Sequence, residues 1–190
     1  MPIPESQLET WSHQGSVKQS SATYATVKGA LEAPDASYAN QSHTRFLQGS
    51  YGNDTNIFAD SDVDVVMRLD SAFYHDLEDL ADDEKHAFKS NFSDASYNHA
   101  DFKKDVTAQL RKAFGDAVKP GGKAIFVAGN GSRRDADVLV AAQYRKYHSF
   151  KSMADQNYVE GICFWNAEGT LPFLNNFPHG HYQHDLCEAL

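Results

Sequence analysis

Three aspartates stand close together at the start of an apolar run in the stretch ADSDVDVVMRLD. Asp62 and Asp64 are two residues apart on an expected strand over residues 62–69, so both side chains point to one face. Val63 then points to the opposite, buried face. Two carboxylates on one face can hold one or two Mg²⁺ ions, which prefer oxygen ligands and accompany substrate phosphates. The first aspartate, Asp60, precedes the strand and is expected to be a loop residue.

Two-metal sites stabilise the attacking and leaving oxygens of an in-line displacement, and they need a further carboxylate. Asp137 supplies one, because it opens the apolar run Val138-Leu139-Val140. Asp135 lies two residues earlier and is the competing choice, but Asp137 adjoins the apolar run more directly. We expect antiparallel pairing of this strand with residues 62–69 to bring the carboxylates together.

A Gly-Ser turn upstream is suited to phosphate. Gly49 lets backbone approach a ligand closely. The Ser50 hydroxyl and the amides opening a short helix over residues 51–57 can receive phosphate oxygens, helped by the helix dipole. We therefore predict a nucleoside triphosphate site, with phosphates at Gly49 and Ser50 and metal ions on Asp62, Asp64 and Asp137. Asp137 would also activate an incoming hydroxyl.

Other residues of reactive type have an ordinary interpretation beside the functional one. A His/Cys cluster near the chain end offers possible zinc ligands, although a terminal segment of this kind is more often mobile: His179, His181, His184 and Cys187. Four aromatic residues are capable of stacking on a base, although core packing is the better interpretation: Trp11, Tyr24, Phe164 and Trp165. Five cations are possible phosphate contacts but are too scattered to choose among: Arg45, Lys119, Lys123, Arg133 and Arg134.

The hydrophobic pattern predicts one α+β domain, in which helices pack on a mixed or antiparallel sheet. The expected helices cover residues 5–33 and 98–115, and residues 71–93 are expected to form a helix with a mobile loop. Strands are expected over residues 44–47 and 62–69. Two hairpins follow, one joining residues 123–129 to 137–145 through Asn130-Gly131, the other joining residues 158–165 to 170–174. Gly121-Gly122 reads as a turn.

The bulk composition narrows the class of protein. The 190 residues carry a formal net charge of −9, which gives no overall basic surface for duplex DNA or an anionic membrane. No apolar run is long enough to span a bilayer, and the N-terminus lacks the pattern of a signal peptide. The two cysteines, Cys163 and Cys187, have no metal-type spacing. We expect a cytoplasmic protein.

The spacing of these motifs resembles a known superfamily. Gly49-Ser50, followed about a dozen residues later by Asp62-x-Asp64 and then by Asp137 on a later strand, resembles the nucleotidyltransferases related to DNA polymerase β. The N-terminal ETWSHQGSVKQSSATYATVKGAL resembles the opening helix of bacterial CD-NTases, the group related to cyclic GMP-AMP synthase. GICFWNAEGTLPFLNNFPHGHYQH resembles the end of their sheet. Together the resemblance covers nearly the whole chain.

The resemblance implies a nucleotidyltransferase fold with a long N-terminal helix. It also implies transfer of a nucleotidyl unit from an NTP, ATP or GTP, to a ribose hydroxyl with Mg²⁺ or Mn²⁺. The product would be a cyclic or linear oligonucleotide messenger in antiphage defence, and an activating partner is possible. Residues 1–190 correspond to the catalytic domain alone. The family's helical C-terminal domain is expected to be absent, with residues 179–190 as its possible stump. Two alternatives remain open: an antitoxin that nucleotidylates a partner protein, and a truncated, non-catalytic NTP-binding domain.

Overall fold

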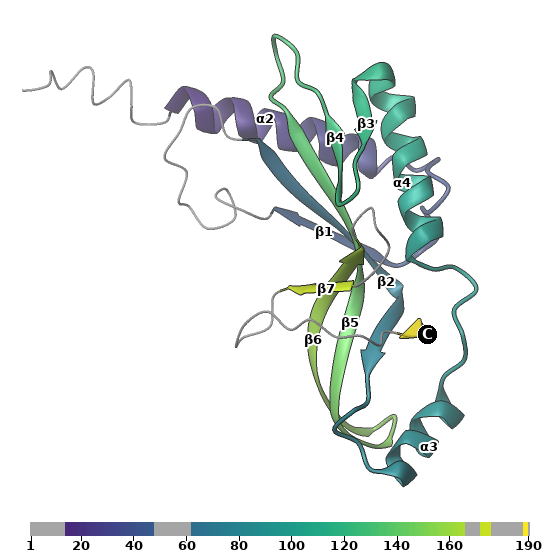
Figure 1. Cartoon of the computed structure of the whole chain (residues 1–190). Helices are drawn as coiled ribbons and strands as arrows, with labels where there is room; N and C mark the ends of the chain where they lie inside the picture. Colours follow the sequence, from purple (N-terminus) through teal and green to yellow (C-terminus); the bar gives the residue numbers. More distant parts are fainter. Residues whose placement is uncertain (1–13, 48–61, 166–171, 176–187, 190) are drawn as a thin grey trace, which may run out of the picture.

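The computed structural model describes residues 14–47, 62–165, 172–175 and 188–189 (Figure 1). Its frame is two long strands, β2 (Val63–Asp76) and β5 (Ala136–Ser152), which pair in parallel. Strand β1 (His43–Leu47) runs antiparallel along the other edge of β2. The main path of the sheet is β1-β2-β5-β4-β3.

Strand β5 is long enough for two strands to follow one another along its second edge. Strand β4 (Ala124–Val127) pairs with residues 136–139, and β6 (Asp155–Trp165) pairs with residues 142–152. Strand β3 (Val118–Pro120) pairs with β4, and β7 (Pro172–Asn175) pairs with β6. The short β8 (Glu188–Ala189) pairs with β2 near its end. The start of β4 and the end of β6 therefore meet beside the middle of β5.

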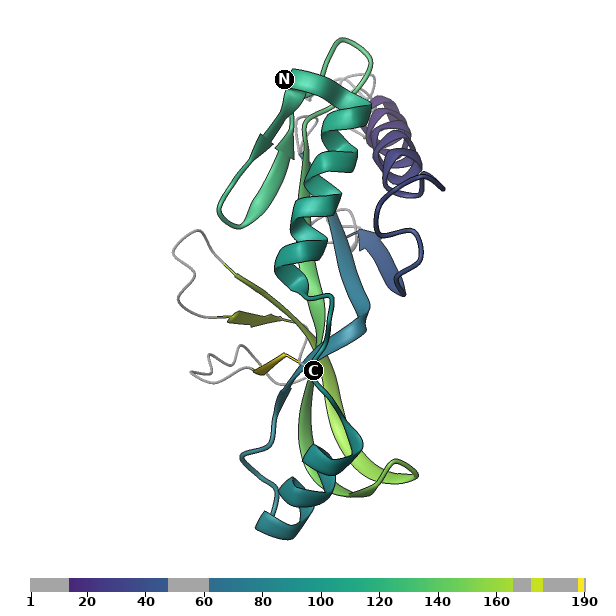
Figure 2. The same cartoon turned by 90° about the vertical axis from the view of Figure 1, so that its right-hand side faces the viewer.

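Two helices, α2 (Gln14–Leu31) and α4 (His99–Phe114), cover one face of this sheet (Figures 1 and 2). Helix α4 begins where the Asn98 side chain accepts hydrogen bonds from the amides of Ala100 and Asp101, and the 3₁₀ turn Gly115–Ala117 follows it. The helices bury side chains against alternate positions of β2 and β5, which is the pattern of a half-covered sheet. The main residues of this core are Val27, Leu31, Phe102, Val106, Leu110, Val65, Met67, Val138 and Val140.

The far end of the sheet carries a second, aromatic cluster. Helix α3 (Asp82–Asn91) packs there against the ends of β2, β5 and β6, as Figure 2 shows. Phe88 is its centre, with ring centroids 5.0 Å from Tyr147 and 5.2 Å from Phe150. Edge-to-face packing of this kind stabilises the end of the long strands.

Most of the expected elements are confirmed. The helix predicted over residues 98–115 is α4, the strand at 44–47 is β1, and both predicted hairpins pair antiparallel. The helix predicted over 5–33 is present as α2 in its described part. The short helix over 51–57 lies outside the described residues. No helix in the described ranges is long and apolar enough to cross a membrane.

One predicted element is wrong. Residues 71–76 were expected to belong to a helix and loop, but they continue β2 after an irregularity between Leu69 and Phe73. The physical reason is the length of β5, which offers a pairing edge as far as Lys146. Ala72, Phe73 and Tyr74 are buried against it. Tertiary pairing has overridden a weak local preference.

Candidate active site

The predicted catalytic carboxylates Asp64 and Asp137 lie directly opposite one another. Asp64 on β2 pairs in register with Asp137 on β5. A hydrogen bond from the Val63 amide to the Asp135 carbonyl, 3.1 Å long, opens the ladder one step earlier. Neighbouring strands lie about 4.8 Å apart, and registered residues share a face. The structure therefore brings these two carboxylates together on one face of the sheet.

The expected antiparallel pairing of these two strands is wrong, because they run parallel. Parallel strands need a long crossover connection. Here that connection contains α3, α4 and the β3–β4 hairpin. Both carboxylates consequently stand near the start of their own strands, at the same end of the sheet. Antiparallel pairing would have placed one strand's start beside the other strand's end.

The carboxylates stand on the face that α2 and α4 leave open. Val63 and Val65, the neighbours of Asp64 along the strand, are buried in the helix-covered core. On the open face, the next positions build a small apolar cluster beside the acids: Val66, Leu139, Ala141, Ile162 and Phe164, with Phe46 at its border. An acidic end and an adjoining apolar patch thus share one open surface.

The negative charges of these acids act on one another. Burial raises the pKa of Asp64, and the negative charges of Asp137 and Asp62 raise it further. Burial likewise raises the pKa of Asp137, as do Asp62 and Asp135. Asp62 is exposed and precedes β2 by one residue, and its charge reaches both carboxylates. Each ionised carboxylate thus costs the fold free energy, which a cation would relieve.

Lys123 is the cation that opposes this crowding. Its positive charge lowers the pKa values of both Asp64 and Asp137, although not enough to cancel the upward shifts. The Lys123 ammonium lies 5.4 Å from the centre of the Phe164 ring, in the apolar patch beside the acids. Nothing in the spacing of the sequence distinguishes Lys123 from the other cations, because its reach depends on β4 and β6 meeting along β5.

Asp135, the competing choice for the third carboxylate, has a structural partner. Its Oδ1 accepts a hydrogen bond of 2.6 Å from the Gly129 amide. A side chain at position 129 is excluded, since a Cβ there would lie 2.5 Å from the Arg133 carbonyl oxygen. Asp135 therefore ties the loop before β5, whereas Asp137 faces Asp64.

The remaining sequence candidates mostly have structural contacts. Arg45 forms an ion pair with Glu32, and the Arg133 guanidinium lies 4.3 Å from the Phe114 ring centre. Phe164 is buried, and Tyr24 packs at the edge of the core. Several further candidates lie outside the described residues: Trp11, Gly49, Ser50, Asp60, His179, His181, His184 and Cys187. Their predicted roles remain predictions.

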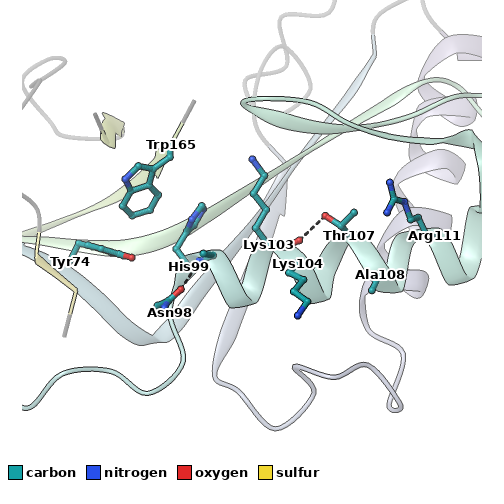
Figure 3. Close-up of a pocket in the computed structure, with 10 residues that line it drawn as sticks. Tyr74, Asn98, His99, Lys103, Lys104, Thr107, Ala108, Arg111 and Trp165 are labelled. Carbon is teal, nitrogen blue, oxygen red and sulfur yellow. Dashed lines mark hydrogen bonds between the residues drawn. The ribbon is translucent and has the colours of Figure 1, made fainter. Parts of the chain in front are cut away.

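A separate groove of about 1150 Å³ runs along α4 on the helix-covered side of the sheet (Figure 3). Tyr74 and Trp165 stand at one end, their ring centroids 4.6 Å apart. Lys103 rises from the helix, and its Nζ donates to the Gly122 carbonyl at 2.9 Å. The groove lines the back of the sheet, so it does not include the opposed carboxylates.

The donor atoms at the carboxylates suit a hard divalent cation. Asp62, Asp64 and Asp137 offer only oxygen atoms, and their mutual repulsion leaves a site for positive charge. Within the described ranges, no three His, Cys, Asp or Glu side chains already form a group that holds one ion. The fit of Asp62, Asp64 and Asp137 to Mg²⁺ or Mn²⁺ is therefore one of donor chemistry and charge, and not of a preassembled group of three ligands.

Comparison with known proteins shows which proteins the chain is similar to. No protein-family model matches it. The cyclic UMP-AMP synthase of Rhodothermus marinus is 37% identical over 189 residues, which are 99% of this chain and 62% of that protein. The cyclic dipurine nucleotide synthase of Elizabethkingia meningoseptica is 34% identical over 182 residues, 96% of this chain and 60% of that protein.

Solved structures agree. The R. marinus CdnE c-UMP-AMP synthase with Apcpp and Upnpp superposes with a TM-score of 0.71 at 37% identity, covering 92% of this chain and 56% of that one. The E. meningoseptica CdnE cyclic dinucleotide synthase with GTP and Apcpp gives a TM-score of 0.58 at 30% identity, covering 92% of this chain and 55% of that one. The mixed sheet and its helices are thus a nucleotidyltransferase fold.

Over nearly its whole length, the chain is similar to CD-NTases. The relatives named above are cyclic nucleotide synthases, which are nucleotidyltransferase enzymes. The chain spans 62% and 60% of the length of those two relatives. The predicted resemblance to the CD-NTase group and the predicted α+β fold are confirmed.

Proposed function

We propose that this chain is the catalytic domain of a metal-dependent nucleotidyltransferase that joins NTPs into a cyclic or linear oligonucleotide messenger. The observation that carries the proposal is the register of Asp64 and Asp137, which opposes two carboxylates on the open face. The relatives named as cyclic nucleotide synthases support the reaction class. The chain itself contains the opposed carboxylates, which supports assigning residues 1–190 to the catalytic domain.

The carboxylates would hold the metal. Asp62, Asp64 and Asp137 would ligate Mg²⁺ or Mn²⁺, which supplies charge stabilisation at the reacting phosphate. Asp137 accepts the proton of the incoming ribose hydroxyl, whose oxygen bonds to the α-phosphorus while the bond to pyrophosphate breaks. Gly49 and Ser50 remain the proposed contacts of the triphosphate.

The proposed substrates, cellular location and biological role rest on the relatives and on the sequence. Solved relatives contain Apcpp, Upnpp or GTP, which supports NTPs such as ATP or GTP here. A cytoplasmic location is supported by the small number of cysteines, two in 190 residues. A role in antiphage defence and control by an activating partner stay at the level of the family resemblance.

Product analysis tests the proposal. Each labelled NTP, alone and in mixtures, is incubated with the chain and Mg²⁺ or Mn²⁺, and products are separated and identified. The expected result is metal-dependent pyrophosphate release with an oligonucleotide product, lost in Asp64→Asn. Asp116→Asn is the matched control, since Asp116 is exposed on the turn after α4.

The same assay separates the alternatives. Label transferred to a partner protein with no free oligonucleotide would support the antitoxin function. Metal-dependent NTP binding without pyrophosphate release would support a non-catalytic domain. Full activity in Asp64→Asn would overturn the assignment of the metal site.

A further inference from the structure

We propose that Lys123 binds the phosphates of the nucleotide held at Asp64 and Asp137, and that the β3–β4 hairpin and Lys103 position it there. This inference rests on the proposed function and adds a residue to its site. Five cations are possible phosphate contacts from the sequence. The structure gives Arg45 and Arg133 other partners and leaves Lys123 beside the acids.

Lys123 lies on the β3–β4 hairpin, beside the open face of the sheet. It directly precedes β4, whose first residue, Ala124, pairs with Leu139 of β5. Strand β6 ends on the same edge, and its Phe164 ring lies under the Lys123 ammonium at 5.4 Å. Phe164 belongs to the apolar patch on the open face, so the ammonium projects over the face that carries the carboxylates.

The Lys123 ammonium is available to bind a ligand. Lys123 is exposed, and no carboxylate in the described part of the chain lies within ion-pair distance of its ammonium. The next residue, Ala124, pairs with Leu139, which lies two residues along β5 from Asp137 and on the same face. A lysine ammonium on a flexible stem suits phosphate oxygens that enter beside the acids.

Hydrogen bonds hold the β3–β4 hairpin in place. The Gly121 amide donates to the Ala124 carbonyl at 2.8 Å, and a Cβ at position 121 would lie 2.6 Å from that oxygen. From the helix-covered side, the Lys103 ammonium donates to the Gly122 carbonyl at 2.9 Å. Figure 3 shows Lys103 extending away from α4. The residue before Lys123 is thus tied to a helix of the core, which makes Lys103 a positioning residue.

Charge balance also favours a cation beside these acids. Asp62, Asp64 and Asp137 are like charges, and a triphosphate brings more negative charge to the same face. Metal ions offset part of this charge, and a lysine on the same face offsets more. A phosphate contact made by a charged group contributes roughly 1.5 kcal/mol or more, which corresponds to about a tenfold change in Kd.

Binding of Mg²⁺ with Apcpp, a non-hydrolysable ATP analogue, tests the proposal by calorimetry. The expected result is a roughly tenfold higher Kd for Lys123→Gln and recovery to within about threefold of wild type for Lys123→Arg. Lys119→Gln is the matched control, because Lys119 is an exposed lysine on the same hairpin. For AMP, which lacks the outer phosphates, Lys123→Gln should raise the Kd much less. Lys103→Met should raise the Kd for the metal–Apcpp complex by less than Lys123→Gln does. If Lys123 acted without help from Lys103, this variant would bind as wild type does.

The outcomes are distinguishable from failure of the proposed function. A wild-type chain that does not bind the metal-analogue complex would overturn both proposals. Binding that needs Asp64 but is unchanged in Lys123→Gln would overturn only the role of Lys123. An equal loss in Lys119→Gln would also overturn it, because the effect would then reflect overall charge.

Discussion

Arg68 on β2 and Glu160 on β6 form an ion pair across the intervening strand β5, with 2.7 Å between Nη1 and Oε1. Gln143 of β5 donates to the other Glu160 oxygen at 2.6 Å. The Arg68 Nε also donates to Asp70 at 2.6 Å. This polar row crosses three strands on the open face, beyond the apolar patch, and it ties together the strands that carry or border the carboxylates.

The polar row should contribute modestly to stability. In a double-mutant cycle of Arg68→Gln and Glu160→Gln, we expect a coupling free energy of about 0.5–1 kcal/mol, because both partners are partly exposed to solvent. Urea unfolding of the four proteins measures it. The value should fall in high salt, which screens exposed ion pairs. A coupling free energy of zero at low salt would mean that the row does not stabilise the sheet.

His99 should make stability fall on acidification. Burial lowers its pKa from 6.5 to about 4, and its Nε2 lies 3.0 Å from the Val140 carbonyl. Between these pH values the unfolded chain binds more protons than the folded one, so stability is complete above pH 6.5. It should decline by roughly 3 kcal/mol as the pH falls to 4.

Unfolding of wild type and His99→Gln at several pH values checks this effect of His99. The variant should lose less free energy of unfolding between pH 7 and pH 4. Comparing the two proteins removes the contributions of Asp64 and Asp137, whose raised pKa values act in the opposite direction. Equal slopes in the two proteins would show that His99 is not buried as a neutral ring.

Removing a carboxylate should stabilise the metal-free fold while disabling the site. Asp64 has a raised pKa, so its charged form is disfavoured on folding. Its contribution to stability is present at acidic pH and is lost as the pH rises through the raised value. At pH 7 without metal, Asp64→Asn should therefore unfold at a higher temperature. Its free energy of unfolding should exceed that of wild type by at most about 1 kcal/mol, because solvent screens the repulsion.

Adding Mg²⁺ should reverse this order of stability. Wild type should gain stability from the ion, because only the folded state assembles the carboxylates. Asp64→Asn should gain much less, and Asp116→Asn should gain as much as wild type. If Asp64→Asn were less stable than wild type in metal-free buffer, the repulsion inferred at Asp64 would be contradicted.

The sequence pointed to two acids that the structure brings together, and the limits of that prediction have physical causes. Asp64 and Asp137 are recognisable because each is an acid at the start of an apolar strand. The direction of pairing is not recognisable, because it depends on the path of the chain between the two strands. Lys123 could not be chosen among the cations, since its position depends on where two distant strands meet along β5. The extension of β2 through Tyr74 likewise depends on the length of its neighbour.

The most direct test of the central claim compares two neighbouring aspartates. Pyrophosphate release from NTPs with Mg²⁺ is measured for wild type, Asp137→Asn and Asp135→Asn. We expect Asp137→Asn to lose activity by a factor of about a hundred or more, which is the scale of a lost catalytic group. Asp135→Asn should stay near wild type, because an asparagine oxygen can still accept the Gly129 amide. Loss of activity in Asp135→Asn with activity kept in Asp137→Asn would contradict the assignment of the opposed pair.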